Sequence, residues 1–355
     1  MISPTSLPVT GGYAGDPMAS TLPFITIILP VYNEARFIAR TLEQIASQDY
    51  PRDRYEVLVV DGMSSDDTVK IALSMQHEFE NFRVIENHKR RSSSARNLGF
   101  KEGRGDYYMI IDGHVYIAGR GLLKDVAEIF TEKDYHVLAR PQPLTPPDNS
   151  FFQNAVAYAR ESVIGHGTDS TIYNMEYEGE VNPSSSGAMY SREVIEKVGY
   201  VDEGFDAAED YEHNYRIGQA GFRAYFSPRL AVYYYPRESL GSLFAQMARY
   251  GLGRFRMWRK HKALSSGVMA PPVFFLTILV TTFLSLLMSE VWIIPALMLA
   301  GYLAVITAGS VFVSMKRGFR YLLLFPFIYL MIHLGLAWGF VSGMFKRNRT
   351  TEVSL

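Results

Sequence analysis

The chain has 355 residues, of which 35 are Lys or Arg and 36 are Asp or Glu, and its formal net charge is −1 at pH 7. This balance leaves no basic footprint for nucleic acid, so we expect no nucleic-acid partner. The sequence contains no Cys, which excludes disulfide bonds, thiolate metal sites and cysteine nucleophiles. Nearly all long apolar runs lie after Val268, which predicts a soluble-type N-terminal part followed by membrane segments.

The first third of the chain alternates between strand and helix patterns. Residues 1–21 are rich in Gly, Pro, Ser and Thr, and we expect a flexible arm there. Short apolar or β-branched runs predict strands at 24–29, 55–60, 82–85 and 107–111. Apolar residues at helical spacing predict helices at 35–47 and 68–79, and a further helix opens at residue 92. This order predicts an α/β fold with a doubly wound, mostly parallel sheet.

Three of the predicted strands lead directly into loops that carry acids, namely Glu34, Asp61 and Asp112. In open α/β sheets the ligand lies beyond the carboxyl ends of the strands, so we expect these carboxylates at one edge. Asp112 and His114 are two residues apart on an extended backbone and would point to the same side. Together they could hold a divalent cation, either Mg²⁺ or Mn²⁺. Taken alone, Asp-Gly-His is better explained by a capping Asp and a surface His, and the neighbouring acids favour the metal.

Two motifs that would indicate other nucleotide-binding folds are missing from the first strand–helix turn. Neither G-x-G-x-x-G nor G-x-x-x-x-G-K-[ST] occurs there. This argues against dinucleotide-binding and P-loop folds.

Glu209 and Asp210 open another predicted helix, close in sequence to a polar loop at Ser184–Gly187. Acids are favoured at a helix N-terminus by the helix dipole, and that effect alone would explain them. The polar loop, however, could form a sugar pocket beside Asp210. A carboxylate next to a bound sugar could take the proton from an attacking hydroxyl group, so Asp210 is our candidate general base.

Residues 240–262 have the pattern of a basic amphipathic helix. No acid occurs from Ser239 to Ser289, and one helical stripe is apolar, formed by Phe244, Met247, Gly251, Phe255 and Trp258. Such a helix is typical of segments that lie in a membrane surface, with the apolar stripe in the acyl boundary. The alternative is an ordinary basic helix that packs on the domain.

Three uncharged stretches within 268–345 are each long enough to cross about 30 Å of hydrocarbon, at Val268–Ser289, Val291–Met315 and Tyr321–Phe345. Basic residues before the first and after the second place the preceding domain in the cytoplasm of a bacterial-type inner membrane. The tail 346–355 begins with Lys346 and Arg347, which three crossings would put outside. We therefore expect an integral membrane protein and leave the crossing of the third segment open.

Several of these motifs together resemble those of family 2 glycosyltransferases with the GT-A fold. They are PVYNE at 30–34, DGMSSDDT at 61–68, SSSARNLG at 92–99, DGH at 112–114 and the E-D pair at 209–210. The resemblance covers about residues 22–240 and is greatest to bacterial exopolysaccharide enzymes of the succinoglycan type, although D-G-H replaces the commoner D-x-D. Gln246, Arg249 and Tyr250 also resemble the Q-x-x-R-W motif of membrane polysaccharide synthases, with Tyr in place of Trp.

The resemblance implies a catalytic domain at 22–239 and inverting transfer of a sugar from a nucleotide-diphosphate donor, expected to be UDP-linked, to a lipid-linked polyprenyl acceptor. It implies donor contacts from Pro30, Tyr32, Asn33, Glu34, Asp61, Ser64, Arg96 and Asp112. Acceptor or phosphate contacts would come from Gly187, Glu209, Gln246 and Arg249. Asp112 and His114 would bind the metal, and Asp210 would be the base.

Two other functions fit the same residues. A polyprenyl-phosphate sugar synthase uses the lipid phosphate itself as nucleophile, and because that phosphate is already ionised it needs no base. A nucleotide-sensing membrane protein would bind the donor without turnover. The combination of Asp112, His114 and Asp210 argues against sensing, since sensing requires no base.

Overall fold

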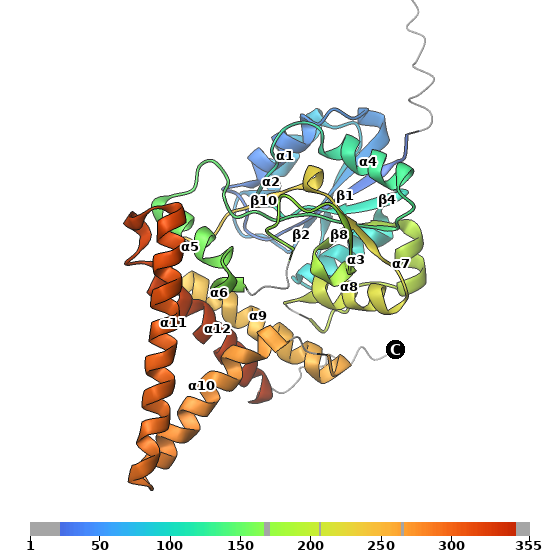
Figure 1. The fold of residues 1–355 in the computed structure, drawn as a ribbon. Helices are drawn as coiled ribbons and strands as arrows, with labels where there is room; N and C mark the ends of the chain where they lie inside the picture. The colour runs from blue at the N-terminus through green and yellow to red at the C-terminus, as the bar shows by residue number, and fades with distance from the viewer. Residues whose placement is uncertain (1–21, 167–170, 206, 264–265, 346–355) are drawn as a thin grey trace, which may run out of the picture.

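An α/β domain with a set of long helices on one side makes up the protein, as seen in a computed structural model that describes residues 22–166, 171–205, 207–263 and 266–345 (Figure 1). The predicted arm at 1–21 and the tail at 346–355 lie outside these described residues.

The α/β domain is built on an eight-stranded sheet with the order β3-β2-β1-β4-β8-β6-β9-β7. Its first half comprises β1 (Ile25–Val31), β2 (Tyr55–Asp61), β3 (Phe82–Glu86) and β4 (Tyr107–Ile110), which are parallel to one another. Its second half comprises β6 (Val137–Ala139), β7 (Gly179–Val181), β8 (Gly187–Ser191) and β9 (Ala224–Phe226). Only β7 and β8 run against the rest of this sheet. The predicted mostly parallel, doubly wound sheet is thus confirmed.

The central strands are buried on both faces, which explains why they read as continuous apolar runs. On β1, Ile25, Ile27 and Leu29 belong to one apolar cluster, while Ile28 belongs to the cluster on the opposite face. The covering helices are α1 (Ile38–Ala46), α2 (Thr68–Ser74), α3 (Ser92–Glu102) and α4 (Leu122–Glu132). A separate antiparallel pair is formed by β5 (Val115–Tyr116) and β10 (Tyr233–Tyr234).

Two predicted helices are shorter than expected. The helix predicted at 35–47 begins only at Ile38, because the carbonyl of Glu34 accepts the N–H groups of Phe37 and Ile38 in a turn. The helix predicted at 68–79 ends at Ser74, and a short 3₁₀ turn follows at Gln76–Glu78.

The later part of the α/β domain contributes four further helices. They are α5 (Phe151–Arg160), α6 (Val163–His166), α7 (Arg192–Val198) and α8 (Glu209–Gln219). Next comes α9 (Leu240–His261), whose start is fixed by a capping box between Ser239 and Ser242. Its bounds agree with the predicted amphipathic segment.

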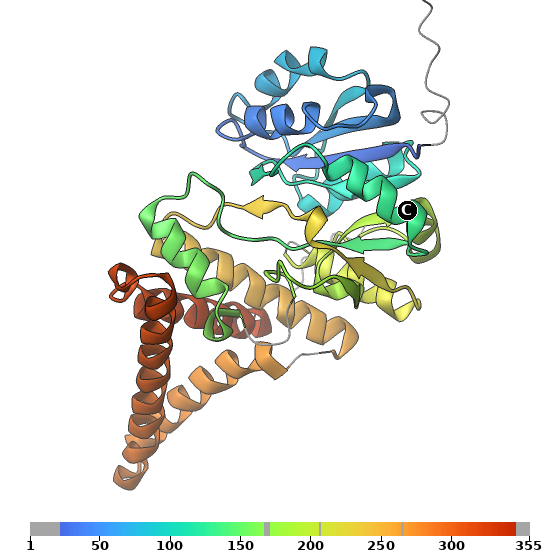
Figure 2. The ribbon, with the colours of Figure 1, turned by 45° about the horizontal axis from the view of Figure 1, so that its top comes forward.

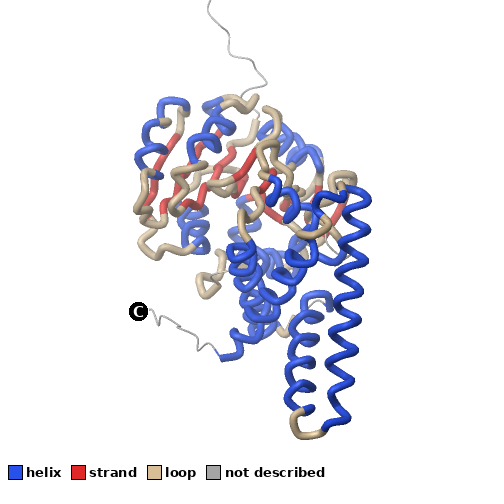
Figure 3. The backbone as a smooth tube through the Cα atoms, turned by 90° about the vertical axis from the view of Figure 1, so that its left-hand side faces the viewer, coloured by secondary structure: helices blue, strands red, loops and turns tan. Residues whose placement is uncertain are grey.

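The apolar C-terminal part consists of α10 (Ser266–Ser285), α11 (Ile293–Arg317) and α12 (Phe325–Phe345). Among the described residues, Ser289–Arg317 and Phe325–Phe345 are long and apolar enough to cross a membrane, whereas the apolar helix Met269–Ser285 is shorter. Helices α10 and α11 form a hairpin that projects away from the α/β domain (Figure 3). Helix α12 instead lies along α9, beneath the α/β domain (Figure 2).

The apolar stripe of α9 faces α12, which corrects the expectation that it points into lipid. Met247, Gly251 and Phe255 are buried, and the ring of Phe255 lies 5.5 Å from that of Phe340 on α12. The two helix backbones come very close, since a Cβ on Gly339 would overlap the carbonyl group of Ala248. The apolar stripe of α9, which the sequence predicted to contact lipid, contacts the apolar helix α12.

Candidate active site

Acids gather where β1, β2 and β4 end, at one edge of the sheet. Asp61 is the last residue of β2 and pairs in register with Val31, the last residue of β1, so the two strands end level. Glu34 follows β1 and Asp112 follows β4, which is parallel to β1 on its other side. The structure therefore brings together the three strand-end acids that the sequence singled out.

The loops after β1 and β2 are tied together by side-chain hydrogen bonds. Asp61 is 3% exposed and its carboxylate accepts the N–H of Ser64 at 3.0 Å. The Ser64 Oγ accepts the N–H of Asn33 at 2.8 Å, and the Asn33 Oδ1 accepts the N–H of Ser65 at 2.8 Å. Asn33 has a φ of 54°, a left-handed conformation that Asn tolerates better than most residues.

These contacts give the predicted donor residues different local environments. Asp61, Asn33 and Ser64 hold together the loops after β1 and β2, which we call the double loop. The side chain of Tyr32, in the same region, is exposed. Pro30 lies within β1 and is half-buried.

Glu34 and His114 form a pair that the sequence did not indicate. The Nδ1 of His114 lies 2.7 Å from Oε1 of Glu34. Burial opposes the charged ring, but Glu34 and Asp112 raise the pKa of His114 above its ordinary value. Gly113 between the two predicted metal ligands is buried, and a Cβ there would lie 3.0 Å from the Cγ of Glu34. Gly113 is therefore suited to the close approach of the Glu34 side chain.

The donor set of Asp112 and His114 is compatible with a divalent cation. A ligating His commonly donates its other ring N–H to a carboxylate, and Glu34 provides that carboxylate, so Nε2 remains for a metal. Within the described residues no group of three or more His, Asp or Glu side chains is arranged to hold a metal ion. A cation held by one or two protein ligands normally completes its coordination with substrate phosphates and water.

The buried Arg96 connects the strand-end acids with the acids of α8. Its Nη2 lies 3.5 Å from Oε1 of Glu209. Although burial acts in the opposite direction, Glu209, Asp210 and Asp112 together raise the pKa of Arg96. Its buried Nε has no hydrogen-bond partner within the described residues. Asp210 itself is exposed at the first turn of α8, where the dipole favours an acid. Arg96 thus interacts electrostatically with both Asp112 and Asp210, which are more than 90 residues apart in the sequence.

Gly187, a predicted acceptor or phosphate contact, lies in a tightly packed environment. It is buried at the start of β8, and a Cβ on it would lie 2.7 Å from Oδ1 of Asn214. Its carbonyl accepts hydrogen bonds from Asn214 and from the hydroxyl of Tyr190. The expected flexible sugar loop is therefore packed tightly against α8 at this residue.

Helix α9 is attached to α8 next to Asp210. The fully buried Glu212 lies 2.7 Å from Nζ of Lys260 and 2.9 Å from Nε2 of His261. The guanidinium of Arg254 lies 3.8 Å from the ring centre of Tyr211. These contacts place the predicted acceptor residues Gln246 and Arg249 on a helix that is fixed to the α8 acids.

Sequence reasoning missed three residues around the site. Arg140 is fully buried, and its Nη2 donates to the carbonyl of Ile110 at 3.0 Å and to the hydroxyl of Tyr234 at 3.2 Å. Burial and the neighbouring Asp112 raise the pKa of Tyr234. Neither Arg140 nor Tyr234 lies in a recognisable motif. Glu212 carried a signal, because Arg216 follows it at the i,i+4 spacing of a helical ion pair.

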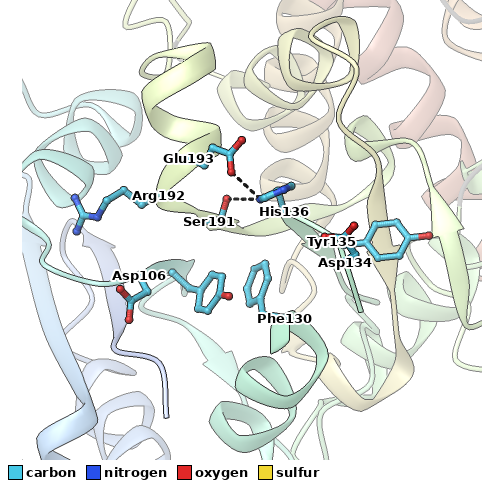
Figure 4. Close-up of a pocket in the computed structure, with 9 residues that line it drawn as sticks. Asp106, Phe130, Asp134, Tyr135, His136, Ser191, Arg192 and Glu193 are labelled. Carbon is cyan, nitrogen blue, oxygen red and sulfur yellow. Dashed lines mark hydrogen bonds and ion pairs between the residues drawn. The ribbon is translucent and has the colours of Figure 1, made fainter. Parts of the chain in front are cut away.

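A hollow lined by Asp106, Phe130, His136 and Arg192 is separate from the candidate active site (Figure 4). Asp106 directly precedes β4, so this hollow is at the end of the sheet opposite to Asp112. His136 contacts Glu193 at 3.5 Å and Ser191 at 3.2 Å there. The position of the hollow separates it from the strand-end acids.

Comparison with known proteins gives consistent matches. Residues 26–199 match the family described as Glycosyl transferase family 2, and residues 120–342 match Glycosyl transferase family group 2. The chain is 32% identical over 243 residues to the succinoglycan biosynthesis protein ExoA of Rhizobium meliloti (strain 1021), covering 67% of this chain and 71% of that protein.

A second relative matches along nearly its whole length. It is the dolichyl N-acetyl-alpha-D-glucosaminyl phosphate 3-beta-D-2,3-diacetamido-2,3-dideoxy-beta-D-glucuronosyltransferase of Methanococcus voltae, 28% identical over 92% of this chain and 99% of that protein. Among solved structures, the mannosyltransferase PcManGT from Pyrobaculum calidifontis, in complex with GDP-Man and Mn²⁺, superposes with a TM-score of 0.57. That match has 20% identity and covers 92% of this chain and 88% of the other. It shows that the two proteins share a fold.

Proposed function

The chain belongs to glycosyltransferase family 2, and from this membership we propose that it transfers a sugar from a UDP-linked donor to a lipid-linked acceptor at the cytoplasmic face of a bacterial-type inner membrane. The observation that carries the proposal is the buried Arg96, which interacts with Asp112 on one side and with Asp210 and Glu209 on the other. This interaction supports a single site to which donor-side and acceptor-side acids both contribute.

The proposed reaction is a displacement at the anomeric carbon. Asp210 takes the proton of the acceptor hydroxyl, whose oxygen forms the new bond while the bond from the anomeric carbon to the diphosphate breaks. A positioned base of this kind contributes about 10²–10⁴-fold. UDP leaves with the bonding electron pair, and the configuration at the anomeric carbon is inverted.

The remaining residues bind and orient the donor. The double loop of Asn33, Asp61 and Ser64 would hold the nucleoside, with the exposed ring of Tyr32 available to a base. Arg96 would face the diphosphate. A divalent cation held by Asp112 and Nε2 of His114 would neutralise the negative charge of the leaving diphosphate.

The apolar C-terminal helices support a lipid-linked acceptor. Two described helices are long and apolar enough to cross a bilayer, and α12 packs along α9 directly beneath the α/β domain. The Methanococcus relative is named for a dolichyl phosphate sugar acceptor, and the Rhizobium relative for biosynthesis of a polysaccharide. We extend the lipid-linked acceptor from the former to this chain.

A polyprenyl-phosphate sugar synthase is the second candidate, and the Asp210→Asn variant separates the two. If a hydroxyl is the nucleophile, the variant loses its base, and turnover falls by at least about 10² while donor affinity changes little. The measurement is UDP release by the full chain with a panel of UDP-sugars and a membrane lipid extract, together with a donor-binding titration.

Near-normal turnover in Asp210→Asn would favour a phosphate nucleophile. A weaker donor affinity with unchanged turnover would assign Asp210 to binding. Failure of the parent protein to release UDP with any donor would instead support a nucleotide sensor.

A further inference from the structure

The turn at residues 112–114, which carries both predicted metal ligands, has a buried side and an open side. Burial alternates along residues 111–117, where the odd-numbered residues are buried and the even-numbered ones are partly exposed. This period of two places Asp112 and His114 on the same, open side of the backbone. The turn lies between β4, which ends at Ile110, and β5, which begins at Val115. Contacts from outside these two strands must therefore fix its conformation.

Two buried side chains donate hydrogen bonds to backbone carbonyls on either side of Asp112. The Oγ1 of Thr41, on α1, donates to the carbonyl of Gly113 at 2.9 Å. The Nη2 of Arg140, which follows β6, donates to the carbonyl of Ile110 at 3.0 Å. Thr41 is 0% exposed and Arg140 is 1% exposed, so water does not compete for either carbonyl at these contacts. Elements far apart in the sequence thus hold the turn from its buried side.

Tyr234 holds the same turn from β10. Its hydroxyl accepts a hydrogen bond from Nη2 of Arg140 at 3.2 Å, and its backbone pairs in register with Val115. A tyrosine hydroxyl that accepts in this way still has its own proton to donate. Burial and then the negative charge of Asp112 raise the pKa of Tyr234, which places that carboxylate near the hydroxyl. We call Thr41, Arg140 and Tyr234 the turn clamp.

The identity of one clamp residue indicates more than ordinary packing. A buried carbonyl needs only a neutral donor, whereas Arg140 brings a charge into the interior, and its Nε and Nη1 have no hydrogen-bond partner in the part of the chain that the structure describes. Burying a charge in this way is costly. On the open side of the turn, Glu34 already fixes the ring of His114. Outer partners that fix the ligands from several directions are typical of metal sites.

We propose that the turn clamp positions Asp112 and His114 for one divalent cation, an inference that rests on the metal pair of the proposed function. In this role the three side chains act through the backbone of the turn and through Asp112. The consequence is ion selectivity. Mg²⁺ requires nearly octahedral ligands at about 2.0–2.1 Å, whereas Ca²⁺ accepts flexible geometry at about 2.3–2.6 Å. A turn that is held rigidly favours Mg²⁺, and a loosened turn loses that preference.

Thr41 offers a pair of variants that separates its hydroxyl from its packing. Thr41→Val keeps the branched shape and removes the donor, whereas Thr41→Ser keeps the donor and removes a methyl group. Arg140→Gln and Tyr234→Phe remove the other two clamp contacts. The matched control is Thr26→Val, because Thr26 is also 0% exposed and its hydroxyl donates to Glu56 at 2.8 Å. Thr26 is the second residue of β1, at the end of the sheet opposite to the turn.

The test measures metal binding by the detergent-solubilised full chain in the presence of UDP, without turnover. Free Mn²⁺ is followed by its paramagnetic signal, and Mg²⁺ and Ca²⁺ are measured by displacement of Mn²⁺. We expect the three variants that remove a clamp contact to weaken Mg²⁺ binding at least about 10-fold. Ca²⁺ binding should weaken less than about 3-fold, because Ca²⁺ tolerates irregular geometry. Thr41→Ser and Thr26→Val should keep the Mg²⁺/Ca²⁺ affinity ratio of the parent protein.

The affinity ratio distinguishes positioning from a general loss of structure, which would weaken both ions alike. If Arg140→Gln does not fold, Thr41→Val and Tyr234→Phe decide the outcome. A parent-like ratio in Thr41→Val would overturn the proposal, and so would an equal change in Thr41→Ser or in Thr26→Val. Failure of the parent protein to bind any of the three cations would also overturn it. Sugar transfer is measured separately by UDP release, so these outcomes are distinct from failure of the proposed function.

Discussion

The carboxylate of Glu34 and the imidazole of His114 form a hydrogen bond although 80 residues separate them in the sequence. This contact bears on the predicted roles of both residues. Glu34 orients the ring and leaves Nε2 directed away from the carboxylate. We therefore predict that Glu34, which the family resemblance assigns to the donor, instead positions the ring of His114 for a metal ion.

The Glu34→Ala variant should weaken divalent metal binding by about 10–100-fold, the usual effect of removing the partner of a ligating His. Asp112→Asn should weaken it further, because a ligand is lost outright. The measurement is a Mn²⁺ titration in the presence of UDP, followed by the paramagnetic signal of free Mn²⁺, and it needs no turnover. Unchanged Mn²⁺ affinity in Glu34→Ala, with UDP binding retained, would remove Glu34 from this role.

At the scale of elements, α8 and α9 are held together by Glu212. Burial opposes its ionisation, but the hydrogen bond from Lys260, the charge of Arg216 and the contact with His261 lower the pKa of Glu212. The stabilisation is therefore present above the unfolded pKa of a Glu, near about 4.3, and is lost as pH falls through the lower folded pKa.

Glu212→Gln should lower the free energy of unfolding by about 3–5 kcal/mol at pH 7, because it leaves buried cations without their anion. The difference in Tm between parent and variant should shrink below about pH 4. Glu193→Gln is the control, since the Glu193–Lys197 ion pair is exposed to water, where such pairs contribute little to stability. A Tm difference that is constant from pH 7 to pH 3.5 would contradict the role of the charge.

The close packing of α12 on α9 makes a second prediction at this scale. Gly339→Val places a side chain where the carbonyl of Ala248 lies, and should destabilise the protein by more than the roughly 1–3 kcal/mol usual for overpacking, because backbone cannot yield. Gly301→Val on α11 is the control, since nothing lies within 4 Å of its Cβ position. Equal Tm values for the two variants in the same detergent would mean that α12 does not depend on this contact.

The sequence was most informative where the controlling interactions are local. The strand-end acids and the bounds of α9 follow from apolar runs, short turns and the capping box between Ser239 and Ser242, all of which lie within a few residues. The pairing of Glu34 with His114 depends on where the chain returns in space. The partner of the α9 stripe was also unpredictable, because α12 is apolar all round and so shows no face.

At the scale of the whole molecule, the charges around the apolar helices agree with a hairpin and an in-plane helix. If α10 and α11 both cross and α12 lies along α9, the basic residues before α10, after α11 and after α12 all belong on the cytoplasmic side. Three crossings would place Lys346 and Arg347 outside. The hairpin tip contains Glu290 and Trp292, an acid and an interfacial aromatic residue, and no basic residue.

This topology can be measured directly because the chain contains no Cys. Glu290→Cys, Arg320→Cys and Arg349→Cys each introduce a single thiol, and intact spheroplasts are treated with a membrane-impermeant maleimide. We expect labelling of Glu290→Cys alone, because the hairpin tip would be the only one of the three positions outside the inner membrane. Arg320→Cys and Arg349→Cys should react only after the membrane is permeabilised. Labelling of Arg349→Cys in intact spheroplasts would show that α12 crosses the bilayer. In that case the packing of α12 along α9 would have to be broken in the membrane, and Gly339→Val would leave the labelling pattern unchanged. If α12 remains in plane, the same helix stays packed along α9 beneath the α/β domain.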